Sequence, residues 1–174
     1  AVAGASNDGD RASLIFRDGT SFATDAVIAA DGIHSPVRTA IFGKDSPRFT
    51  GIVSWRAVVP RDTVPDIPNL DSFTKWWGAT RDIQIVTFPL LRGEEVFIFA
   101  TTPLEGWEEE GWTLPGDPDQ LREIYAGFHP EARALLSAVT EVTRSALHVR
   151  EPMPRWTVGR ITLLGDAAHP MVPF

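Results

Sequence analysis

The sequence predicts a mixed fold, in which the two ends of the chain form an α/β domain and the middle of the chain forms an inserted α+β domain. Two short apolar strands, Val27–Ala30 and Arg160–Leu164, each end in a turn that contains glycine and aspartate. Continuous apolar runs of this kind are typical of strands buried on both faces of a parallel sheet. Between them, short strand-like runs separated by turn residues predict an antiparallel sheet followed by helices. The order of these elements indicates one domain in two parts, with a second domain inserted between them.

The first part of the chain is expected to contain a hairpin and a short helix. Residues 4–10 are rich in glycine, asparagine and aspartate, which predicts a cluster of turns. Ala12–Phe16 and Phe22–Ala30 are rich in strand-forming residues, and Asp18-Gly19 between them is a hairpin signal. The pair Ser35-Pro36 then provides a favourable N-cap and a proline for the first helical position.

The middle of the chain is expected to form a sheet and two helices. Strands are predicted at residues 51–59, 73–77, 83–88, 96–101 and 142–149, loops at 60–68 and 106–116, and a turn at Arg92-Gly93-Glu94. Asp117-Pro118 is an N-cap followed by proline, and the apolar spacing after it predicts a helix up to Phe128. Residues 130–139 predict a second helix, so we expect an α+β domain here.

The composition of the chain is that of a soluble, globular protein. Of its 174 residues, 43% are hydrophobic and 22% are charged, which is too apolar for a disordered chain. The net charge of −7 and the lack of a basic block argue against nucleic acid or an anionic membrane as a partner. Without cysteine, disulfides and thiolate metal sites are excluded, and the scattered histidines predict no metal site. No apolar run is long enough to span a bilayer, so we expect a cytoplasmic protein.

The first chemical motif follows the strand that ends at Ala30. Asp31-Gly32 lies at the strand end, Ser35 can cap a helix, and Arg38 lies on the first turn of that helix. Glycine permits a close backbone approach, and amides at the helix N-terminus would favour a phosphate. The alternative interpretation is structural, with Asp31 closing the turn and Arg38 pairing with an acidic residue.

The second motif is the string Gly165-Asp166-Ala167-Ala168-His169-Pro170, which follows the last apolar strand. Asp166 is a short carboxylate that can accept hydrogen bonds from sugar hydroxyls. The two alanines after it would let a flat ring approach the backbone. A lone Gly-Asp pair is a weak signal, whereas the longer string is specific.

Taken together, the two strings resemble the DG and GD motifs of the group A flavoprotein aromatic hydroxylases. These are the relatives of para-hydroxybenzoate, salicylate and 6-hydroxynicotinate hydroxylases. Gly51-x-x-x-Trp55-Arg56 and Arg150-Glu151-Pro152 also resemble that family, and the likeness covers essentially the whole chain. The resemblance implies a partial FAD-binding domain, Rossmann-like and of the para-hydroxybenzoate hydroxylase type, at residues 1–46 and 155–174. Residues 47–154 would then form the substrate-binding domain.

The resemblance also implies which residues contact the cofactor. FAD would be bound by four residues of the second motif, Gly165, Asp166, Ala167 and Ala168. The pyrophosphate would lie near Asp31, Ser35 and Arg38, in a region also implicated in binding NAD(P)H. Gly32 of the same motif would also contact the cofactor. Pro173 would lie near the reactive edge of the flavin, as a candidate for a role in catalysis. The implied reaction is reduction of FAD by NAD(P)H, addition of O2, and hydroxylation of a small aromatic substrate.

The predicted strand at residues 83–88 departs from the family pattern. In the salicylate and hydroxynicotinate branch, the corresponding strand resembles one with a histidine and, four residues later, a tyrosine. Gln84 and Phe88 occupy these places and would contact the substrate from one face. Gln84 is a second candidate for a role in catalysis, although it cannot act as a general base. The alternative interpretation is a core phenylalanine and a partly exposed glutamine.

Two neighbouring residues of the predicted strand at 51–59 are further candidates for contact with a substrate. Trp55 would help to line a pocket for an aromatic ring. Arg56 would either pair with a substrate carboxylate or form a structural salt bridge.

Parts of the family pattern are missing from the chain. It contains no Gly-x-Gly-x-x-Gly string, and it stops soon after the second motif. We therefore expect an internal fragment of a larger enzyme, without tightly bound FAD and inactive by itself. Exposed edges of its sheets would permit homo-oligomers.

Two other functions are compatible with the same residues. One is a non-catalytic ligand-binding or assembly module, in which both motif turns are purely structural. The other is a flavin-dependent reductase or halogenase of the same fold. The residues do not distinguish NADH from NADPH and do not name the aromatic substrate.

Overall fold

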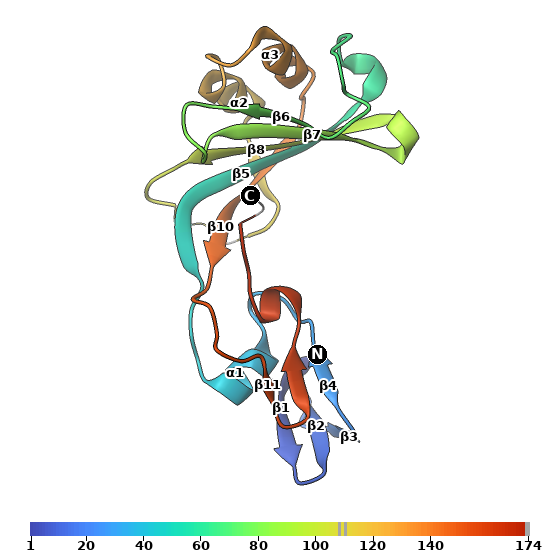
Figure 1. Cartoon of the computed structure of the whole chain (residues 1–174), viewed down its shortest axis with the longest axis vertical. Helices are drawn as coiled ribbons and strands as arrows, with labels where there is room; N and C mark the ends of the chain where they lie inside the picture. The colour runs from blue at the N-terminus through green and yellow to red at the C-terminus, as the bar shows by residue number, and fades with distance from the viewer. Residues whose placement is uncertain (108, 110, 173–174) are drawn as a thin grey trace. The chain divides into compact units, whose positions relative to one another are not determined.

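The chain forms two compact units in the computed structural model, which describes residues 1–107, 109 and 111–172. Unit 1 is made of Ala1–Phe49 and His148–Phe174, and unit 2 is made of Thr50–Leu147 (Figure 1). Antiparallel sheets dominate, and the helices are few and short. The fold is therefore of the mixed class that the sequence predicts.

Unit 1 contains two small sheets and one helix. Its elements are β1 (Val2–Asp8), β2 (Arg11–Phe16), β3 (Ser21–Thr24), β4 (Val27–Ala29), α1 (Pro36–Phe42), β11 (Thr157–Val158) and β12 (Ile161–Leu163), with a 3-10 turn at Gly165–Ala167. The first sheet is antiparallel and has the order β1-β2-β3. The second has the order β11-β12-β4, and β12 runs parallel to β4, as expected of the two apolar strands.

Two sequence-based expectations for unit 1 are wrong. Residues 4–10 do not form a cluster of turns, because β1 occupies most of this segment and pairs along its length with β2. Gly4 suits this strand, since a Cβ there would lie 3.1 Å from the Cβ of Ala40 on α1. In β4, Ile28 is 68% exposed while its two strand neighbours are buried, so this strand is not buried on both faces.

Unit 2 is built on a six-stranded sheet with two helices on one side (Figure 1). Its elements are β5 (Arg48–Pro60), β6 (Thr74–Trp77), β7 (Gln84–Leu90), β8 (Glu95–Pro103), β9 (Leu114–Gly116), α2 (Pro118–Ile124), α3 (Pro130–Ser137) and β10 (Val142–Val149), with 3-10 turns at Arg61–Thr63 and Leu91–Gly93. The sheet has the order β6-β7-β8-β5-β10-β9. The sequence predicts each of these strands except β9, which lies in a predicted loop and pairs with β10.

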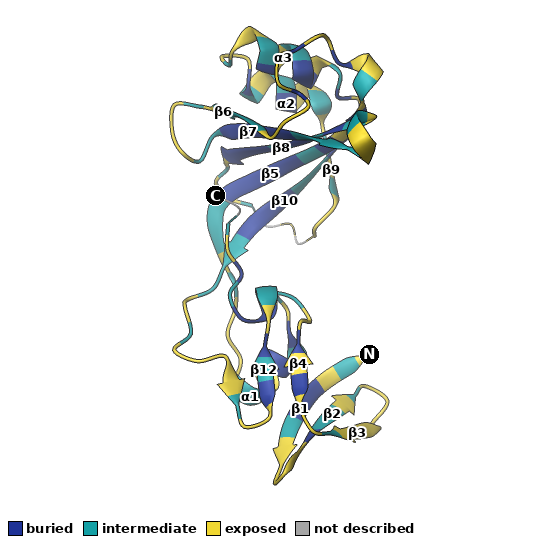
Figure 2. Cartoon of the chain, turned by 45° about the vertical axis from the view of Figure 1, so that its right-hand side comes forward, coloured by how far each residue is buried: buried dark blue, intermediate teal, exposed yellow. Residues whose placement is uncertain are grey.

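The two faces of this sheet have different neighbours. On one face, Trp55, Ile85 and Ile98 pack in a core with residues of both helices, among them Leu121 and Leu135. Figure 2 shows the buried residues concentrated in the central strands. Because side chains alternate along a strand, the residues between these point to the opposite side. We call that side the helix-free face, and it carries Ser54, Arg56, Val58, Gln84, Val86, Phe88, Phe97 and Phe99.

Side-chain hydrogen bonds fix the helix starts and one buried tyrosine. Asp117 Oδ1 accepts a hydrogen bond from the backbone N–H of Asp119 at 2.8 Å, as predicted for an N-cap. The hydroxyl of Tyr125, the residue that caps the C-terminal end of α2, donates to the carbonyl of Thr101 in β8 at 2.6 Å. Burial raises the pKa of the Tyr125 hydroxyl, so it stays protonated and keeps this donor role.

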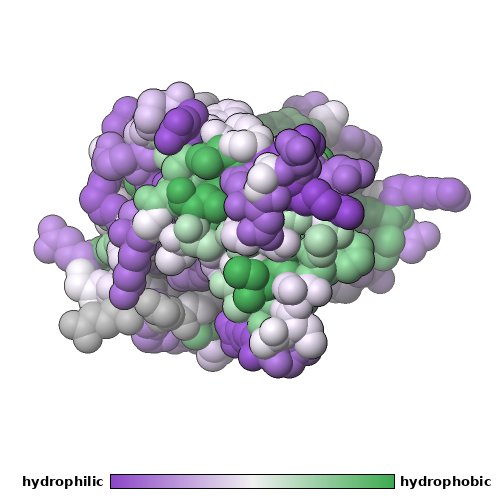
Figure 3. Space-filling view, turned by 90° about the horizontal axis from the view of Figure 1, so that it is seen from below, coloured by the Kyte–Doolittle hydropathy of each residue, from purple (hydrophilic) through white to green (hydrophobic). Residues whose placement is uncertain are grey.

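Large apolar side chains also reach the surface of unit 1. Phe22, Ile28 and Leu164 are each more than half exposed. Figure 3 shows apolar surface interspersed with hydrophilic side chains.

In the part of the chain that the structure describes, no helix has both the length and the apolar character needed to cross a membrane.

Candidate functional site

The two sequence motifs follow the carboxyl ends of β4 and β12, which run parallel to each other. Ala29 lies opposite Leu163 in this pair, and the backbone N–H of Leu164 donates to the carbonyl of Ala29 at 2.9 Å. Because the two strands run in the same direction, the Asp31-Gly32 and Gly165-Asp166 turns follow neighbouring strand ends. The carboxyl ends of parallel strands are where open α/β sheets bind ligands.

The turn at Gly165-Asp166 combines an exposed carboxylate with small buried residues. Gly165 has a φ of 59° and open space where a Cβ would lie. Asp166 is exposed, whereas Ala167 and Ala168 are buried. These residues fit a flavin nucleotide, because the carboxylate can accept sugar hydroxyls and the bare backbone leaves room for a ligand.

Arg38 connects the two motifs within unit 1. Its Nη1 donates to the carbonyls of Ala167 and Ala168, at 3.0 Å each. Its Nη2 forms a salt bridge with Asp45 at 2.8 Å, and its side chain is only 4% exposed. The predicted pairing of Arg38 with an acid is confirmed. The guanidinium therefore holds the backbone of the second motif from inside the unit.

Asp45 and Arg150 complete this charged cluster. Nη1 of Arg150 lies 2.5 Å from Asp45, and its Nη2 donates to the carbonyl of Ile33 at 2.6 Å. Partial burial opposes ionisation of Asp45, but hydrogen bonds from Arg38 and Arg150 hold the pKa of its carboxyl below the usual value. The sequence pointed to Arg150 only through the string Arg150-Glu151-Pro152, and Asp45 lies in an irregular segment with no distinguishing pattern.

Asp31 and Ser35 satisfy two amides at the start of α1. Oδ2 of Asp31 accepts a hydrogen bond from the N–H of Val37 at 3.3 Å, and Oγ of Ser35 accepts one from the N–H of Arg38 at 2.8 Å. These amides therefore have partners within the chain. Asp31 remains exposed, and Gly32 has a φ of 81° with open space beside it. Contact of these motif residues with a cofactor stays a prediction.

Gln84 and Phe88 both lie on the helix-free face of unit 2. Gln84 is 1% exposed and lies opposite Thr101, and its Oε1 has no hydrogen-bond partner among the described residues. The ring of Phe88 lies near those of Phe73 and Phe97, with centroid distances of 6.3 and 4.8 Å. Gln84 is therefore a buried group with unused acceptor capacity, and not the partly exposed residue of the alternative interpretation.

Other predicted site residues are not brought together with this pair. Trp55 lies on the opposite face, in the core beneath α2 and α3, with a ring carbon 3.0 Å from where a Cβ of Gly116 would be. Pro173 lies outside the described residues. Within the described ranges, no three His, Asp or Glu side chains cluster as metal ligands would.

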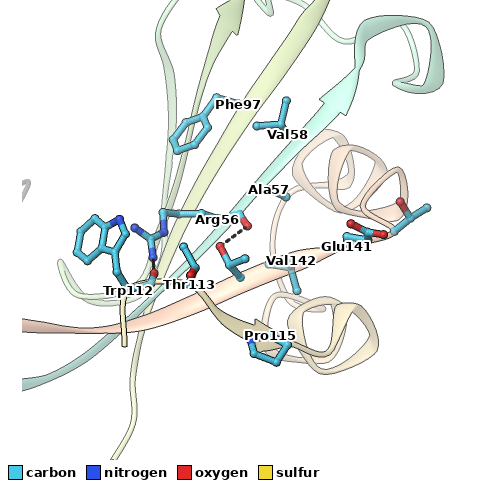
Figure 4. A pocket seen from close by; sticks show the side chains of 12 residues that line it. Arg56, Ala57, Val58, Phe97, Trp112, Thr113, Pro115, Glu141 and Val142 are labelled. Carbon is cyan, nitrogen blue, oxygen red and sulfur yellow. Dashed lines mark hydrogen bonds between the residues drawn. The ribbon is translucent and has the colours of Figure 1, made fainter. Parts of the chain in front are cut away.

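A pocket of about 720 Å³ opens beside Arg56 in unit 2 (Figure 4). Nη2 of Arg56 donates to the carbonyl of Trp112 and, at 3.0 Å, to Oγ of Ser145. The guanidinium carbon lies 4.0 Å from the centroid of the Trp112 ring. Burial lowers the pKa of the Arg56 guanidinium. No acidic residue in the described part of the chain forms a salt bridge with Arg56, so the predicted structural salt bridge is absent there.

The chain matches known proteins over nearly its whole length. The model of the FAD binding domain family covers residues 3–174. The chain is 35% identical over 168 residues to a 6-hydroxynicotinate 3-monooxygenase of Pseudomonas fluorescens, which covers 94% of the chain and 43% of the relative. It is 36% identical over 167 residues to a 3-hydroxybenzoate 6-hydroxylase of Aquipseudomonas alcaligenes, which covers 96% of the chain and 51% of the relative. The chain thus spans about half the length of these curated relatives.

Solved structures show the same fold. A salicylate hydroxylase substrate complex matches 99% of the chain and 46% of its own, with a TM-score of 0.84 and 28% identity. HpxO of Klebsiella pneumoniae, complexed with FAD and uric acid, matches 99% of the chain and 43% of its own, with a TM-score of 0.77 and 30% identity. The chain belongs to the FAD-binding domain family, and the two sequence relatives named above are a monooxygenase and a hydroxylase of aromatic compounds.

Proposed function

We propose that the chain is part of an FAD-dependent monooxygenase that uses NAD(P)H and O2 to hydroxylate a small aromatic substrate. The observation that carries this proposal is the placement of both motif turns at one sheet edge, where Arg38 holds the backbone of Ala167 and Ala168. The relatives named for 6-hydroxynicotinate and 3-hydroxybenzoate supply the reaction class. Because the chain spans about half of those proteins, we assign the activity to the whole protein.

In this proposal, unit 1 holds part of the FAD. Asp166 offers its exposed carboxylate to sugar hydroxyls, and Gly165 leaves room for the ligand next to the backbone. Two arginines and one aspartate in the Arg38–Asp45–Arg150 cluster leave one positive charge in excess, which favours a phosphate nearby. When bound, FAD would supply the chemistry that activates O2, with NAD(P)H as the reductant.

Unit 2 would bind the aromatic substrate on its helix-free face. Oε1 of Gln84 can accept a hydrogen bond from a substrate hydroxyl, and Phe88 and Phe97 provide apolar contacts. A neutral amide does not take up a proton near neutral pH. Gln84 would therefore orient the substrate and would not act as its general base.

The isolated chain is proposed to bind FAD weakly and to be inactive. Its cofactor-facing groups come from two turns, whereas a dinucleotide site of this fold also uses a glycine-rich βαβ unit that the sequence lacks. Titration of the chain with FAD tests this point, and a tight stoichiometric complex with a native-like flavin spectrum would contradict it. A cytoplasmic location and homo-oligomerisation are proposals that rest on the composition and the exposed sheet edges.

The intact protein provides the decisive experiment. Asp166→Ala should lower FAD affinity about tenfold, the equivalent of one or two lost hydrogen bonds. Asp10→Ala, at an exposed aspartate of the same unit, is the matched control and should leave FAD affinity unchanged. With an aromatic panel and ¹⁸O2, we expect substrate-stimulated NAD(P)H oxidation and a labelled hydroxylated product. The proposal would be contradicted if Asp166→Ala bound FAD with full affinity. NAD(P)H oxidation that gave no oxygenated product, or that gave a halogenated product, would also contradict it.

A further inference from the structure

The turn of the first motif is held by Arg150, a residue that belongs to neither motif. Nη2 of Arg150 donates to the carbonyl of Ile33 at 2.6 Å, across 117 positions of the sequence. Ile33 lies in the turn that is closed by a hydrogen bond of 3.0 Å from the N–H of Ser35 to the carbonyl of Gly32. The side chain of Arg150 is only 5% exposed. Arg150 therefore fixes the backbone of this turn from inside unit 1.

Asp45 connects Arg150 to the turn of the second motif. Oδ1 of Asp45 lies 2.5 Å from Nη1 of Arg150, and both oxygens of Asp45 accept hydrogen bonds from Arg38, at 3.2 and 2.8 Å. Arg38 in turn donates to the carbonyls of Ala167 and Ala168, at 3.0 Å each. A continuous series of polar contacts thus runs from one motif turn to the other through two buried guanidinium groups.

Stability alone does not account for two buried arginines in this place. Moving charged groups out of water costs free energy, and well-packed apolar side chains of similar volume often stabilise a protein as much as a buried ion pair does. Nε of Arg150 is buried without a partner among the described residues, which adds to the cost. Apolar side chains, however, cannot supply direction, whereas a guanidinium is a planar fork that fixes the positions of its acceptors. The arrangement therefore favours control of backbone geometry.

The two ends of the series are the turns whose carboxylates face solvent. Asp31 and Asp166 are exposed, whereas the side chains of Arg38 and Arg150 are 4% and 5% exposed. A ligand that contacts both turns must span the distance between them, so its affinity depends on how accurately that distance is maintained. A displacement of about 1 Å can weaken a site strongly, even when the altered residue does not contact the ligand.

We propose that Arg150 is a positioning residue for the FAD site, which acts through Asp45 and Arg38 and does not touch the cofactor. It keeps the two motif turns at the spacing that the flavin nucleotide requires. This inference rests on the proposed function, because it takes both turns as parts of the FAD site. It adds a residue from outside both motifs, whose effect on cofactor binding comes from geometry.

The test is titration of the intact apoprotein with FAD, in which both the affinity and the stoichiometry of binding are measured from the flavin absorbance and fluorescence. Arg150→Gln should weaken FAD binding about tenfold at the native stoichiometry. A role in stability alone would do the reverse, since fewer molecules would be folded but each would bind FAD with native affinity. Arg17→Gln, at an exposed arginine of unit 1, is the matched control and should bind FAD like the native protein.

A double-mutant cycle tests the connection between the turns. Asp166→Ala should lower FAD affinity about tenfold in the native background but only about threefold in the Arg150→Gln background, because a displaced turn makes less use of its carboxylate. Equal losses in the two backgrounds would refute the connection. If Arg150→Gln does not fold, Arg150→Lys takes its place in the cycle, and equal losses again refute the connection.

Arg150→Lys also tests the link through Asp45. Lysine keeps the charge opposite this carboxylate but lacks the planar fork, so Arg150→Lys should bind FAD more tightly than Arg150→Gln and less tightly than the native protein. An Arg150→Lys variant that binds FAD no better than Arg150→Gln would contradict the link through Asp45. Native affinity in Arg150→Lys would contradict the need for the fork.

The outcomes separate this inference from the proposed function. If the native protein binds FAD and Arg150→Gln binds it with equal affinity, the proposed function stands and the positioning role is refuted. A lower stoichiometry with unchanged affinity would also refute it, because Arg150 would then contribute to stability alone. If the native intact protein binds no FAD, both the proposed function and the positioning role are refuted.

Discussion

Replacing Asp45 by asparagine should destabilise the chain by about 2 kcal/mol near neutral pH. Asp45 is the anion between two arginines, Arg38 and Arg150, whose side chains are 4% and 5% exposed. Contacts of 3.2 and 2.8 Å link it to Arg38, and one of 2.5 Å links it to Arg150. Breaking a fully buried ion pair costs about 3–5 kcal/mol, because the remaining charge stays without a partner.

Two features of the cluster reduce this cost. The side chain of Asp45 is 44% exposed, so solvent screens part of its charge. Asparagine also keeps one oxygen that can accept a hydrogen bond from one arginine. We therefore expect about 2 kcal/mol for Asp45→Asn, and about 3 kcal/mol for Asp45→Ala, which removes every acceptor.

The pH dependence of stability gives the sharper test. The pKa of Asp45 is lowered in the folded chain from its usual 3.8, so its contribution is complete above that value. The contribution is then lost as the pH falls through the folded pKa, because the unfolded carboxyl takes up its proton first. The free-energy difference between the native chain and Asp45→Asn should therefore be largest from about pH 5 to 7 and shrink below about pH 4.

Urea unfolding followed by tryptophan fluorescence measures both effects. Asp10→Asn, at an exposed aspartate of unit 1, controls for the general loss of negative charge. A difference below about 0.5 kcal/mol at neutral pH is typical of an ordinary surface position. Such a result, or a difference that persists unchanged at low pH, would refute the assignment of Asp45 as the counter-ion of the two arginines.

Three further substitutions test the site and the core. Gly165→Ala should lower the free energy of unfolding by about 1 kcal/mol because of its positive φ, and unchanged stability would show that the turn relaxes. Tyr125→Phe should cost about 1–2 kcal/mol in urea unfolding by removing the buried hydrogen bond to the carbonyl of Thr101, and no loss would contradict that hydrogen bond. Gln84→Leu should leave stability unchanged or raised, because it removes a buried acceptor that has no partner among the described residues, yet lower kcat/KM of the intact enzyme about tenfold. Lower stability with unchanged kcat/KM would indicate a purely structural role for Gln84.

Local features of the fold were predictable because their determinants lie within a few residues of each other. The N-cap at Ser35 and the proline after it define the start of α1 without any distant partner. The apolar run before Gly165-Asp166 likewise predicts a strand followed by a turn, and β12 and its 3-10 turn follow that pattern. In both cases the residues that form the motif also determine the local backbone conformation.

Features that depend on distant partners were not predictable in this way. The sequence of the β1 segment predicts turns. The segment nevertheless forms a strand, because β2 supplies its hydrogen bonds. Asp45 has no periodic or motif context, and its position between Arg38 and Arg150 depends on residues that are far apart in the sequence. The pocket beside Arg56 was missed for the same reason, since Trp112 lies in a predicted loop.

Exposure divides the motif residues into two groups with different roles. Asp31 and Asp166 are exposed at the strand ends, so they can exchange contacts with water for contacts with a ligand. Arg38 and Ala167 are both buried, and the guanidinium of Arg38 donates a hydrogen bond to the carbonyl of Ala167. This contact fixes the backbone of the second motif. The family resemblance assigns all of them to the cofactor alike. The structure shows that Arg38 fixes the backbone at Ala167 and Ala168, and contact of any of these residues with a cofactor stays a prediction.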